Sequence, residues 1–490
     1  MTVRRRNWGI FLALCALAIV LLWVRQARIS GLFAQVGSND LNARIAATRV
    51  LLDRDIIPGA LPTQEVIIRS KIAPALAVIR DQKAVNSLIR LLSDFEDAPR
   101  RWARSALVKV GPPAIPDLCQ LLINGDDNAK KGAVEALSRM GPAAVPYLRR
   151  LMTIPAARDN ACLALGNIGA APRPGSPQAT AAFAPLIRAA GNEDWDLANA
   201  AIPILGDRSV VAAVEPLRAV LGNSMVRKNA VIALGGIVDA RATLDLIPYI
   251  SDVGLRIDAV RALGQIADPR AAPALAKTLG VRDEDYRSAL VLALQRIGAP
   301  AAGVLVGQLR ASDVIVRRTA AQALWGDAVP ATMPALRQAL ADPDAQVRGA
   351  AARALGWPKN VSAIPLLLAA LRDRDGVVVD SAIEALADIG PDAIPALLGL
   401  FSSGDSTLAL YASRTLVTMG EPAAKSLLVA LDSGQPAQQL WAAITLADMG
   451  ERRAIVKMQQ MYPNSQGNLR VILERGLNEL GAQLPRTGSS

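Results

Sequence analysis

The 490-residue chain contains no histidine, and only 3% of its residues are aromatic. The missing imidazole excludes Ser-His-Asp and Cys-His nucleophile systems, histidine general bases, and nearly every zinc or non-haem iron site. Chemistry that uses carboxylates, lysine, tyrosine or a bound cofactor is still open. The composition therefore argues against catalysis without excluding it. The sequence supports no assignment of catalytic, cofactor-binding or metal-ligating residues.

Cysteine is also scarce, and the three cysteines at positions 15, 119 and 162 have neither metal-ligand nor redox spacing. Cys119 and Cys162 lie in apolar helical patterns, where we expect buried thiols.

With 52% hydrophobic residues and few aromatics, the core must consist of Ala, Leu, Ile and Val. Such small aliphatic side chains favour closely packed helices over sheets.

Positive charge is in modest excess, with a net charge of +11. Five arginines and no acid occur in residues 1–28, so the remainder carries a smaller excess over a long chain. This balance weakens an interpretation as a dedicated nucleic-acid binder.

The N-terminus resembles a membrane anchor. Three arginines at positions 4–6 precede an uncharged run over residues 8–24, which Trp8 and Trp23 bracket. As a helix this run spans roughly 25 Å, the short end for a bilayer crossing. A cleaved signal peptide is the alternative, but its best site, Ala16-x-Ala18, lies inside the run. We therefore predict an uncleaved anchor.

The arginines also predict the orientation of this anchor. Three precede the run, whereas Arg25 and Arg28 follow it, which favours a cytoplasmic N-terminus. The protein is then a single-pass protein of the inner (cytoplasmic) membrane, with its soluble part on the extracytoplasmic side. The expected segments are a basic N-terminus (1–7), the anchor (8–24), a juxtamembrane linker (25–40), a repeat region (41–481) and a disordered tail (482–490).

Beyond residue 40 the sequence repeats itself. The mark of each repeat is a small residue followed by leucine near the end of an apolar helical stretch. These leucines occupy positions 76, 107, 137, 165, 205, 234, 263, 294, 324, 355, 386, 416, 446 and 477. They are 28 to 31 residues apart, except for one interval of 40. A period near 30 without strand-like alternation predicts stacked helix pairs, and the long interval contains a proline-rich inserted loop at 170–180.

Each repeat carries proline early in its first helix, where the missing N–H is tolerated. Glycine usually closes the second helix, and we expect it to adopt the left-handed conformation there. The prolines are Pro116, Pro146, Pro185, Pro216, Pro273, Pro334, Pro365 and Pro395. The closing glycines are Gly111, Gly141, Gly169, Gly298, Gly390, Gly420, Gly450 and Gly481.

An acidic residue and an arginine four positions later recur at the start of second helices. We expect the acid to cap the helix, and the arginine to pair with it or with the next repeat. The structural interpretation is favoured over a ligand-binding arginine ladder, because the acids would neutralise such a ladder. The pairs are Asp252/Arg256, Asp283/Arg287, Asp313/Arg317 and Asp344/Arg348.

The repeat resembles the HEAT-repeat superfamily, and more closely the HEAT-like repeats of phycobilin (PBS) lyases. The resemblance covers about residues 41–481, and residues 262–275 (ALGQIADPRAAPAL) carry its motif most completely. It implies an all-α fold, an α-solenoid of about fourteen stacked helix pairs. The superfamily also includes di-iron hydroxylases with His-Glu ligands, which this chain cannot supply.

In such solenoids the second helices line a concave groove. The residues predicted to face a partner there are Arg261, Gln265, Arg296, Trp325, Arg353, Trp357, Glu384, Asp388 and Arg414. Their charges alternate, whereas a nucleic-acid groove would be mostly basic with stacking aromatics. Mixed polarity favours a protein or peptide partner. Trp325 and Trp357 end neighbouring second helices, as core residues or as an exposed binding anchor.

These observations predict a non-catalytic, membrane-anchored scaffold that binds a protein or peptide and needs no cofactor. One alternative is an enzyme or cofactor chaperone resembling phycobilin lyases, which would change colour with tetrapyrrole. Another is a nucleic-acid binder resembling HEAT-like glycosylases, which the mixed groove disfavours.

Overall fold

The computed structural model describes residues 2–57, 64–171, 173, 175–326, 331–357, 359–432 and 435–485, with side chains from Leu17 onward. Within these ranges the chain is helical and contains no strand. Parts of three predicted segments lie outside the described residues: Met1 of the basic N-terminus, 486–490 of the tail, and 58–63, 172, 174, 327–330, 358, 433 and 434 of the repeat region, of which 172 and 174 belong to the inserted loop. The helices form two compact units, Met1–Ile237 and Val238–Ser490, which we describe separately.

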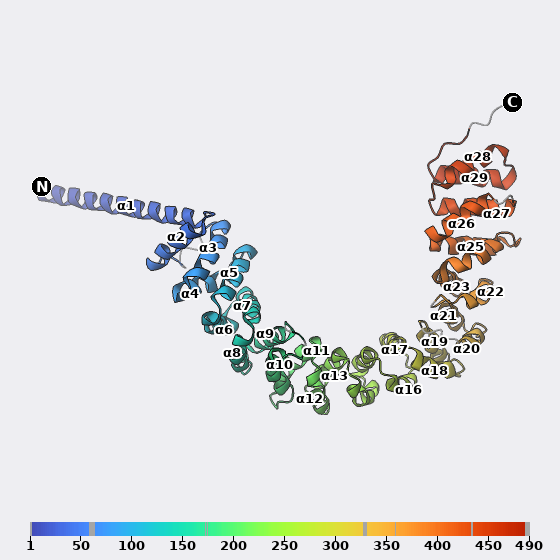
Figure 1. The fold of residues 1–490 in the computed structure, drawn as a ribbon, viewed down its shortest axis with the longest axis horizontal. Coiled ribbons are helices and arrows are strands. Elements are labelled where there is room, and N and C mark those ends of the chain that lie inside the picture. The colour runs from blue at the N-terminus through green and yellow to red at the C-terminus, as the bar shows by residue number, and fades with distance from the viewer. Residues whose placement is uncertain are drawn as a thin grey trace. The chain divides into compact units, whose positions relative to one another are not determined.

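Unit 1 begins with a long helix, α1, and continues with helix pairs, as Figure 1 shows. Short 3-10 turns precede several of the first helices. The bounds are α1 Thr2–Val36, α2 Leu41–Asp53, α3 Val66–Ile79, α4 Gln82–Leu91, α5 Asp97–Val110, α6 Ile115–Asn124, α7 Asp127–Met140, α8 Val145–Leu151, α9 Arg158–Ala170, α10 Pro177–Ala190, α11 Trp195–Asp207, α12 Val214–Ala219 and α13 Arg227–Ile237.

Unit 2 continues the same alternation of a first and a second helix. In Figure 1, α17, α19, α21 and α23 follow one another along one edge of this unit, and α16, α18, α20 and α22 follow along the opposite edge. The bounds are α14 Thr243–Leu246, α15 Arg256–Ile266, α16 Ala272–Ala276, α17 Glu284–Ile297, α18 Ala299–Gln308, α19 Val314–Ala323, α20 Met333–Ala339, α21 Ala345–Gly356, α22 Ile364–Ala370, α23 Gly376–Ile389, α24 Ile394–Leu400, α25 Ser406–Met419, α26 Glu421–Leu431, α27 Pro436–Asp448, α28 Ala454–Met461 and α29 Gly467–Glu479.

The predicted core is confirmed. Each of the fourteen marker leucines is fully buried, at 0% relative exposure, and each lies in or directly after a second helix from α3 to α29. Within each unit, consecutive second helices pack on one another, from α3 to α13 in unit 1 and from α15 to α29 in unit 2, so neighbouring repeats bury their apolar faces against each other. Cys119 and Cys162 are buried too, and burial raises the pKa of these thiols to about 11 and about 12, respectively.

Small residues set the distance between neighbouring second helices. At Gly264 in α15, an added Cβ would lie 2.6 Å from the Cα of Ala293 in α17. Gly206 and Gly356 stand at the matching places in their helices and meet an alanine of the next second helix as closely. The glycine after the marker leucine therefore permits backbone-to-backbone packing, which explains the Ala-Leu-Gly part of the motif.

The repeat boundaries confirm the proline prediction at seven of the eight positions and correct it at Pro185, which lies in the interior of α10. They also correct the glycine prediction. Pro334 is the second residue of α20, where no intrahelical hydrogen bond is lost. The closing glycines do have positive φ, but their ψ values lie between −133° and −149°, outside the left-handed helical region; these are Gly111, Gly141, Gly298, Gly390 and Gly420. That extended region is essentially restricted to glycine.

Gly169 is the exception, and its predicted role was wrong. It lies inside α9, where an added Cβ would be 2.6 Å from the ring of Phe183. Glycine is needed at this position because a side chain would collide with Phe183 of α10. The helix continues through Ala170, and α10 starts at Pro177 because the Ser176 hydroxyl accepts a hydrogen bond from the Ala179 amide. The irregular part of the predicted 170–180 loop is correspondingly shorter.

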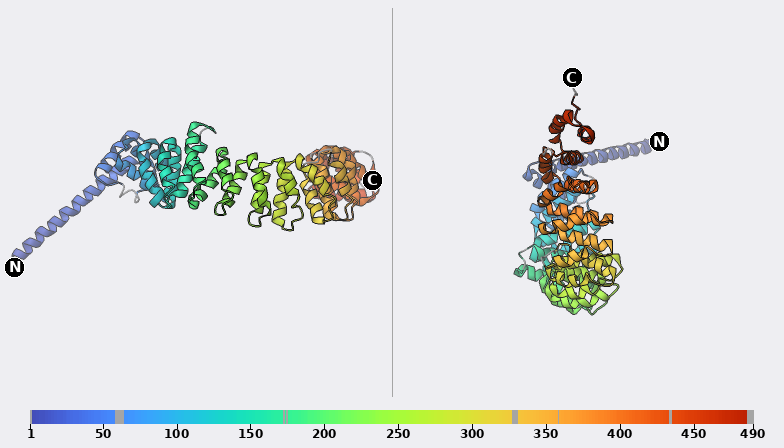
Figure 2. Two further views of the ribbon diagram at one scale, coloured as in Figure 1. Left: turned by 90° about the horizontal axis from the view of Figure 1, so that it is seen from below. Right: turned by 90° about the vertical axis from the view of Figure 1, so that its right-hand side faces the viewer.

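Helix α1 has two distinct parts. Its C-terminal end packs against α2 and α3, and Phe33 and Val36 are buried there. Its preceding part projects from the first repeat, as Figure 2 shows, and its apolar side chains from Leu17 to Trp23 are exposed. The segment Leu17–Val36 is long and apolar enough to cross a membrane. The helix is continuous through the anchor and most of the segment predicted as a juxtamembrane linker.

Candidate functional site

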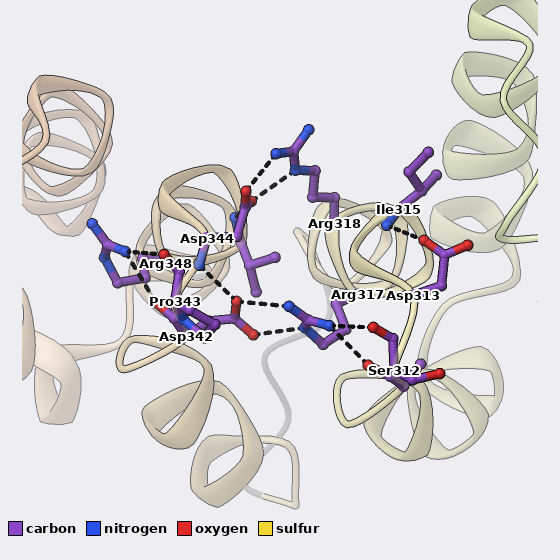
Figure 3. Close-up of polar contacts among 11 residues, drawn as sticks. Ser312, Asp313, Ile315, Arg317, Arg318, Asp342, Pro343, Asp344 and Arg348 are labelled. Carbon is purple, nitrogen blue, oxygen red and sulfur yellow. Dashed lines mark hydrogen bonds and ion pairs between the residues drawn. The ribbon is translucent and has the colours of Figure 1, made fainter.

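Three of the four arginines in the predicted Asp/Arg pairs bond to an acid of the next repeat, as Figure 3 shows for Arg317 between α19 and α21. Asp313 and Asp344 each cap their helix, accepting hydrogen bonds from the amides of Ile315 and Val347. The Arg317 guanidinium reaches Asp342 in the next repeat, with Nε–Oδ2 at 2.8 Å and Nη2–Oδ1 at 3.2 Å. The arginine therefore bridges two repeats.

The next repeat uses the same device. The Arg348 guanidinium pairs with both carboxylate oxygens of Asp373, at 2.8 and 2.7 Å, and also donates to the carbonyl of Asp342. Arg348 is 7% exposed and Asp373 15% exposed, so this ion pair is largely shielded from water. Hydrogen bonding from Arg348 holds the pKa of Asp373 below its usual range.

The other two predicted arginines differ from each other. Arg256 pairs with Asp283, the cap of α17 in the next repeat, at 2.6 Å. Arg287 instead pairs with Glu284 in its own helix. None of the four arginines forms an ion pair with the acid four positions before it among the described residues. The reason is that Asp283, Asp313 and Asp344 turn back onto their own backbone amides as caps.

A cavity of about 480 Å³ opens along the second helices α17, α19, α21 and α23. The ten-residue α19 lies there between the longer α17 and α21, and among the lining residues it contributes Gln322, while Trp325 follows its end. We call this the α17–α23 groove. It is lined by Glu284, Arg287, Ser288, Val291, Leu292, Gln295, Gln322, Trp325, Gln346, Ala350, Arg353, Val377 and Ser381.

Five of the nine predicted partner-facing residues come together at one end of this groove. Trp325 and Arg353 line it, and Trp357 stacks obliquely on Trp325 with 5.9 Å between ring centroids. Glu384 accepts hydrogen bonds from Arg353, with Nε–Oε2 at 2.7 Å. Asp388 interacts electrostatically with both Glu384 and Arg353.

The other four predicted residues are exposed but do not line the groove. Arg261 and Gln265 lie on α15 and Arg296 on α17, and Arg414 on α25 pairs with Asp380 of α23 at 3.1 Å. The prediction placed all nine residues on one surface because of their positions relative to the marker leucine of each repeat. In the structure only Trp325 and Arg353 of these nine line the cavity itself.

The sequence reasoning missed the amide side chains of the groove. Gln322 precedes Leu324 by two positions, the register that also contains Arg353 and Glu384, so this signal was present. Gln346 lies seven residues before Arg353, two turns earlier on the same helix face. Gln295 donates a hydrogen bond to the carbonyl of Gln322 at 3.0 Å, which ties the ends of α17 and α19 together.

Charge at this end of the groove is unevenly compensated. Partial burial raises the pKa of Asp388, the nearby charge of Glu384 raises it further, and Arg353 lowers it. Elsewhere in the described part of the chain, no cluster of three or more acidic or cysteine side chains is placed to hold a metal ion.

The sequence comparison decides the repeat type. A family model of HEAT repeats matches residues 246–325 and 302–387. Residues 246–387 are HEAT repeats. The same two-helix unit recurs in the described parts of both compact units, so the fold is a HEAT-repeat solenoid. The α17–α23 groove lies within the matched HEAT repeats.

Several solved structures are similar to the chain. Importin beta is 14% identical over 92% of this chain and 72% of its own, with a TM-score of 0.47. Kap121p is 16% identical over 91% of this chain, with a TM-score of 0.42, and the chain spans 56% of its length. An engineered protein is 22% identical with a TM-score of 0.28, over 81% of this chain and 99% of its own. No curated protein matches the sequence.

Proposed function

We propose that the protein is a membrane-anchored HEAT-repeat scaffold, without catalytic activity, that binds a protein or peptide partner in the α17–α23 groove. The observation that carries the proposal is the convergence of Trp325, Trp357 and Arg353 at an open cavity. Aromatic and arginine side chains contribute most to binding energy at protein interfaces, especially where they stand beside a pocket.

The groove chemistry supports a polypeptide partner. Its amides, Gln295, Gln322 and Gln346, offer donors and acceptors that match a peptide backbone. Exposed apolar side chains such as Leu292 offer contact area between them. A phosphate-binding groove would need cations free to meet phosphates, whereas Arg287 and Arg353 are already paired with carboxylates.

The exposed apolar part of α1 supports the anchor. Leu17, Leu21 and Trp23 are more than half exposed on a helix whose far end is fixed by Phe33 and Val36. A lipid environment would cover these side chains. With the arginines at positions 4–6 in the cytoplasm, the repeats lie on the extracytoplasmic side of the inner membrane.

Photo-crosslinking in intact cells tests the binding site. A crosslinking amino acid at Ala350, inside the groove, should give an adduct of defined mass with one partner. The same residue at Val429, an exposed position on the first helix α26, is the matched control and should give none. Equal adducts at both positions, or none at Ala350, would contradict the proposal.

Reporter fusions after Ser490 test the anchor's orientation. Alkaline phosphatase should be active there, and a fluorescent protein that folds only in the cytoplasm should be dark. The opposite pair of results refutes the extracytoplasmic placement.

In the same preparations, a spectral change on adding a tetrapyrrole would favour the lyase-like alternative over the scaffold.

A further inference from the structure

We propose that Trp325, Trp357, Glu384 and Asp388 form a site for a lysine or arginine side chain of a basic peptide segment. The inference rests on the proposed partner-binding function and specifies its chemistry. It is carried by the tryptophan geometry, by unused carboxylate oxygens, and by the position of all four residues toward the C-terminal ends of second helices.

The two indoles are arranged to receive a cation. Their ring centroids are 5.9 Å apart and their planes are inclined by 46°, so they form an open angle. Trp325 is 44% exposed and Trp357 is 42% exposed. A pair that served only the core would be buried. Indole faces attract ammonium and guanidinium groups more strongly than other aromatic faces do.

The carboxylates of Glu384 and Asp388, at the same end of the groove, can accept further hydrogen bonds. Both nitrogens of Arg353 that reach Glu384 bond to the same oxygen, Oε2. The other oxygen receives no hydrogen bond from the described residues. Asp388 likewise has no hydrogen-bond or ion-pair partner in the described part of the chain, although Arg353 acts on it at longer range. Two carboxylates therefore face one guanidinium, which leaves an excess negative charge.

Helix ends add to this negative potential. Trp325 follows the end of α19, Trp357 caps α21, and Asp388 lies next to the last residue of α23. Second helices of successive repeats run in the same direction, so the C-terminal ends of the neighbouring helices α19, α21 and α23 lie on the same side of the repeats. The C-terminal end of a helix favours cations.

One exposed cation stands nearby on the other side. Arg296 lies near the end of α17, in the register of Trp357 and Asp388. Along the order of the repeats, Arg296 on α17 places positive charge before the two tryptophans, and Asp388 on α23 places negative charge after them. The basic residue of a bound segment is therefore directed toward α21 and α23, and away from α17.

Peptide titration of the purified full chain in detergent micelles tests the site. The probe is acetyl-Gly-Lys-Gly-Lys-Gly-amide, followed by tryptophan fluorescence and calorimetry. We expect saturable binding that is lost with Nε-acetyl-lysine in place of lysine, which keeps the four-carbon aliphatic chain and removes the charge. A glutamate version should not bind.

Variants connect the binding to the named residues. Trp325→Ala with Trp357→Ala should abolish binding, and Asp388→Asn should weaken it about tenfold. Asp380→Asn on the same helix α23 is the matched control, because Asp380 already pairs with Arg414, and should leave the affinity unchanged. Arg296→Gln should leave the affinity unchanged or increase it. Circular dichroism and melting of each variant show that it is folded.

The outcomes separate this inference from the proposed function. Equal binding of the lysine and acetyl-lysine peptides, or no effect of Asp388→Asn in a folded variant, overturns the cation site. If the Ala350 crosslink to a partner persists in that case, the groove still binds a partner of other chemistry. If the crosslink is absent as well, both the site and the proposed function are refuted.

Discussion

At the scale of single residues, the closest approach between repeats depends on the missing side chain of Gly264. A Cβ there would lie 2.6 Å from the Ala293 backbone, a distance that real contacts do not allow. The backbones of α15 and α17 would have to separate. In contrast, Gly303 in α18 has nothing within 4 Å of the position of its missing Cβ.

These two glycines give a matched pair of variants. Gly264→Ala should lower the free energy of unfolding by about 1–3 kcal/mol, because overpacking forces the helices apart. Gly303→Ala should raise it by about 0.5–1 kcal/mol, because alanine is the better helix former. Urea unfolding measures both. A stabilised Gly264→Ala variant would show that the helices pack less closely than described.

A second residue-scale prediction concerns Asp268 in the repeat motif. Its carboxylate accepts hydrogen bonds from Arg270 and from the Thr243 hydroxyl of the preceding repeat, and it is 7% exposed. Hydrogen bonding with Arg270 is the main cause that lowers the pKa of Asp268 to about 2. The ionised form therefore stabilises the fold at every pH above the ordinary carboxyl pKa.

Asp268→Asn should consequently cost about 2 kcal/mol of unfolding free energy at pH 7. The difference from the wild type should shrink as the pH falls from about 4 toward about 2, where the wild-type carboxylate gains its proton. Urea midpoints across that pH range check this, with the exposed Asp392→Asn as control. A difference that stays constant down to the lowest pH would contradict the assigned role.

At the scale of helices, the arginine links hold second helices to the following repeat. Arg348 on α21 reaches Asp373, which precedes α23, in a pair largely shielded from water. Arg414 on α25 reaches Asp380 on α23, but both partners are more than half exposed. Both links are single arginine–aspartate ion pairs, but their different exposure to water predicts different contributions to the free energy of unfolding.

Arg348→Ala should destabilise the fold by about 3–5 kcal/mol, because it leaves the carboxylate of Asp373, which is largely shielded from water, without its partner. Arg414→Ala should change stability by about 1 kcal/mol or less, since exposed pairs contribute little. Hydrogen exchange should show the Arg348→Ala effect concentrated at α21 and α23, because solenoid repeats contact only their neighbours. Equal effects of the two variants would refute the argument from burial.

The sequence predicted helices and their cores better than it predicted the links and the groove. The leucine period sufficed for the fourteen second helices, because burial and helical spacing are local properties of the sequence. It left open whether Arg317 and Arg348 pair with the acid of their own helix or with the next repeat, since the answer depends on where Asp342 and Asp373 lie after folding. Nor did it show that a cavity lies along α17, α19, α21 and α23, because Gln346 and Ser381 meet there only through helix packing.

At the scale of the whole molecule, α1 combines the exposed apolar part that we propose as the anchor with an end that packs against the first repeat. Residues 2–24 can be removed without touching the buried Phe33 and Val36, whereas removing residues 2–36 exposes the apolar face of α2 and α3. The shorter truncation should release the protein from membranes with an unchanged melting temperature. The longer truncation should also lower that temperature. Membrane fractionation and calorimetry measure the two effects, and membrane retention of the shorter form would contradict the anchor.

The central claim is that the α17–α23 groove is the partner-binding surface. Hydrogen exchange of the full chain tests it most directly, measured with and without the purified partner protein that the Ala350 crosslink captures. We predict slower exchange at the helix segments that line the groove, on α17, α19, α21 and α23, and unchanged exchange at α26 and α28. Protection confined to the first helices, with no change along the groove, would contradict the account.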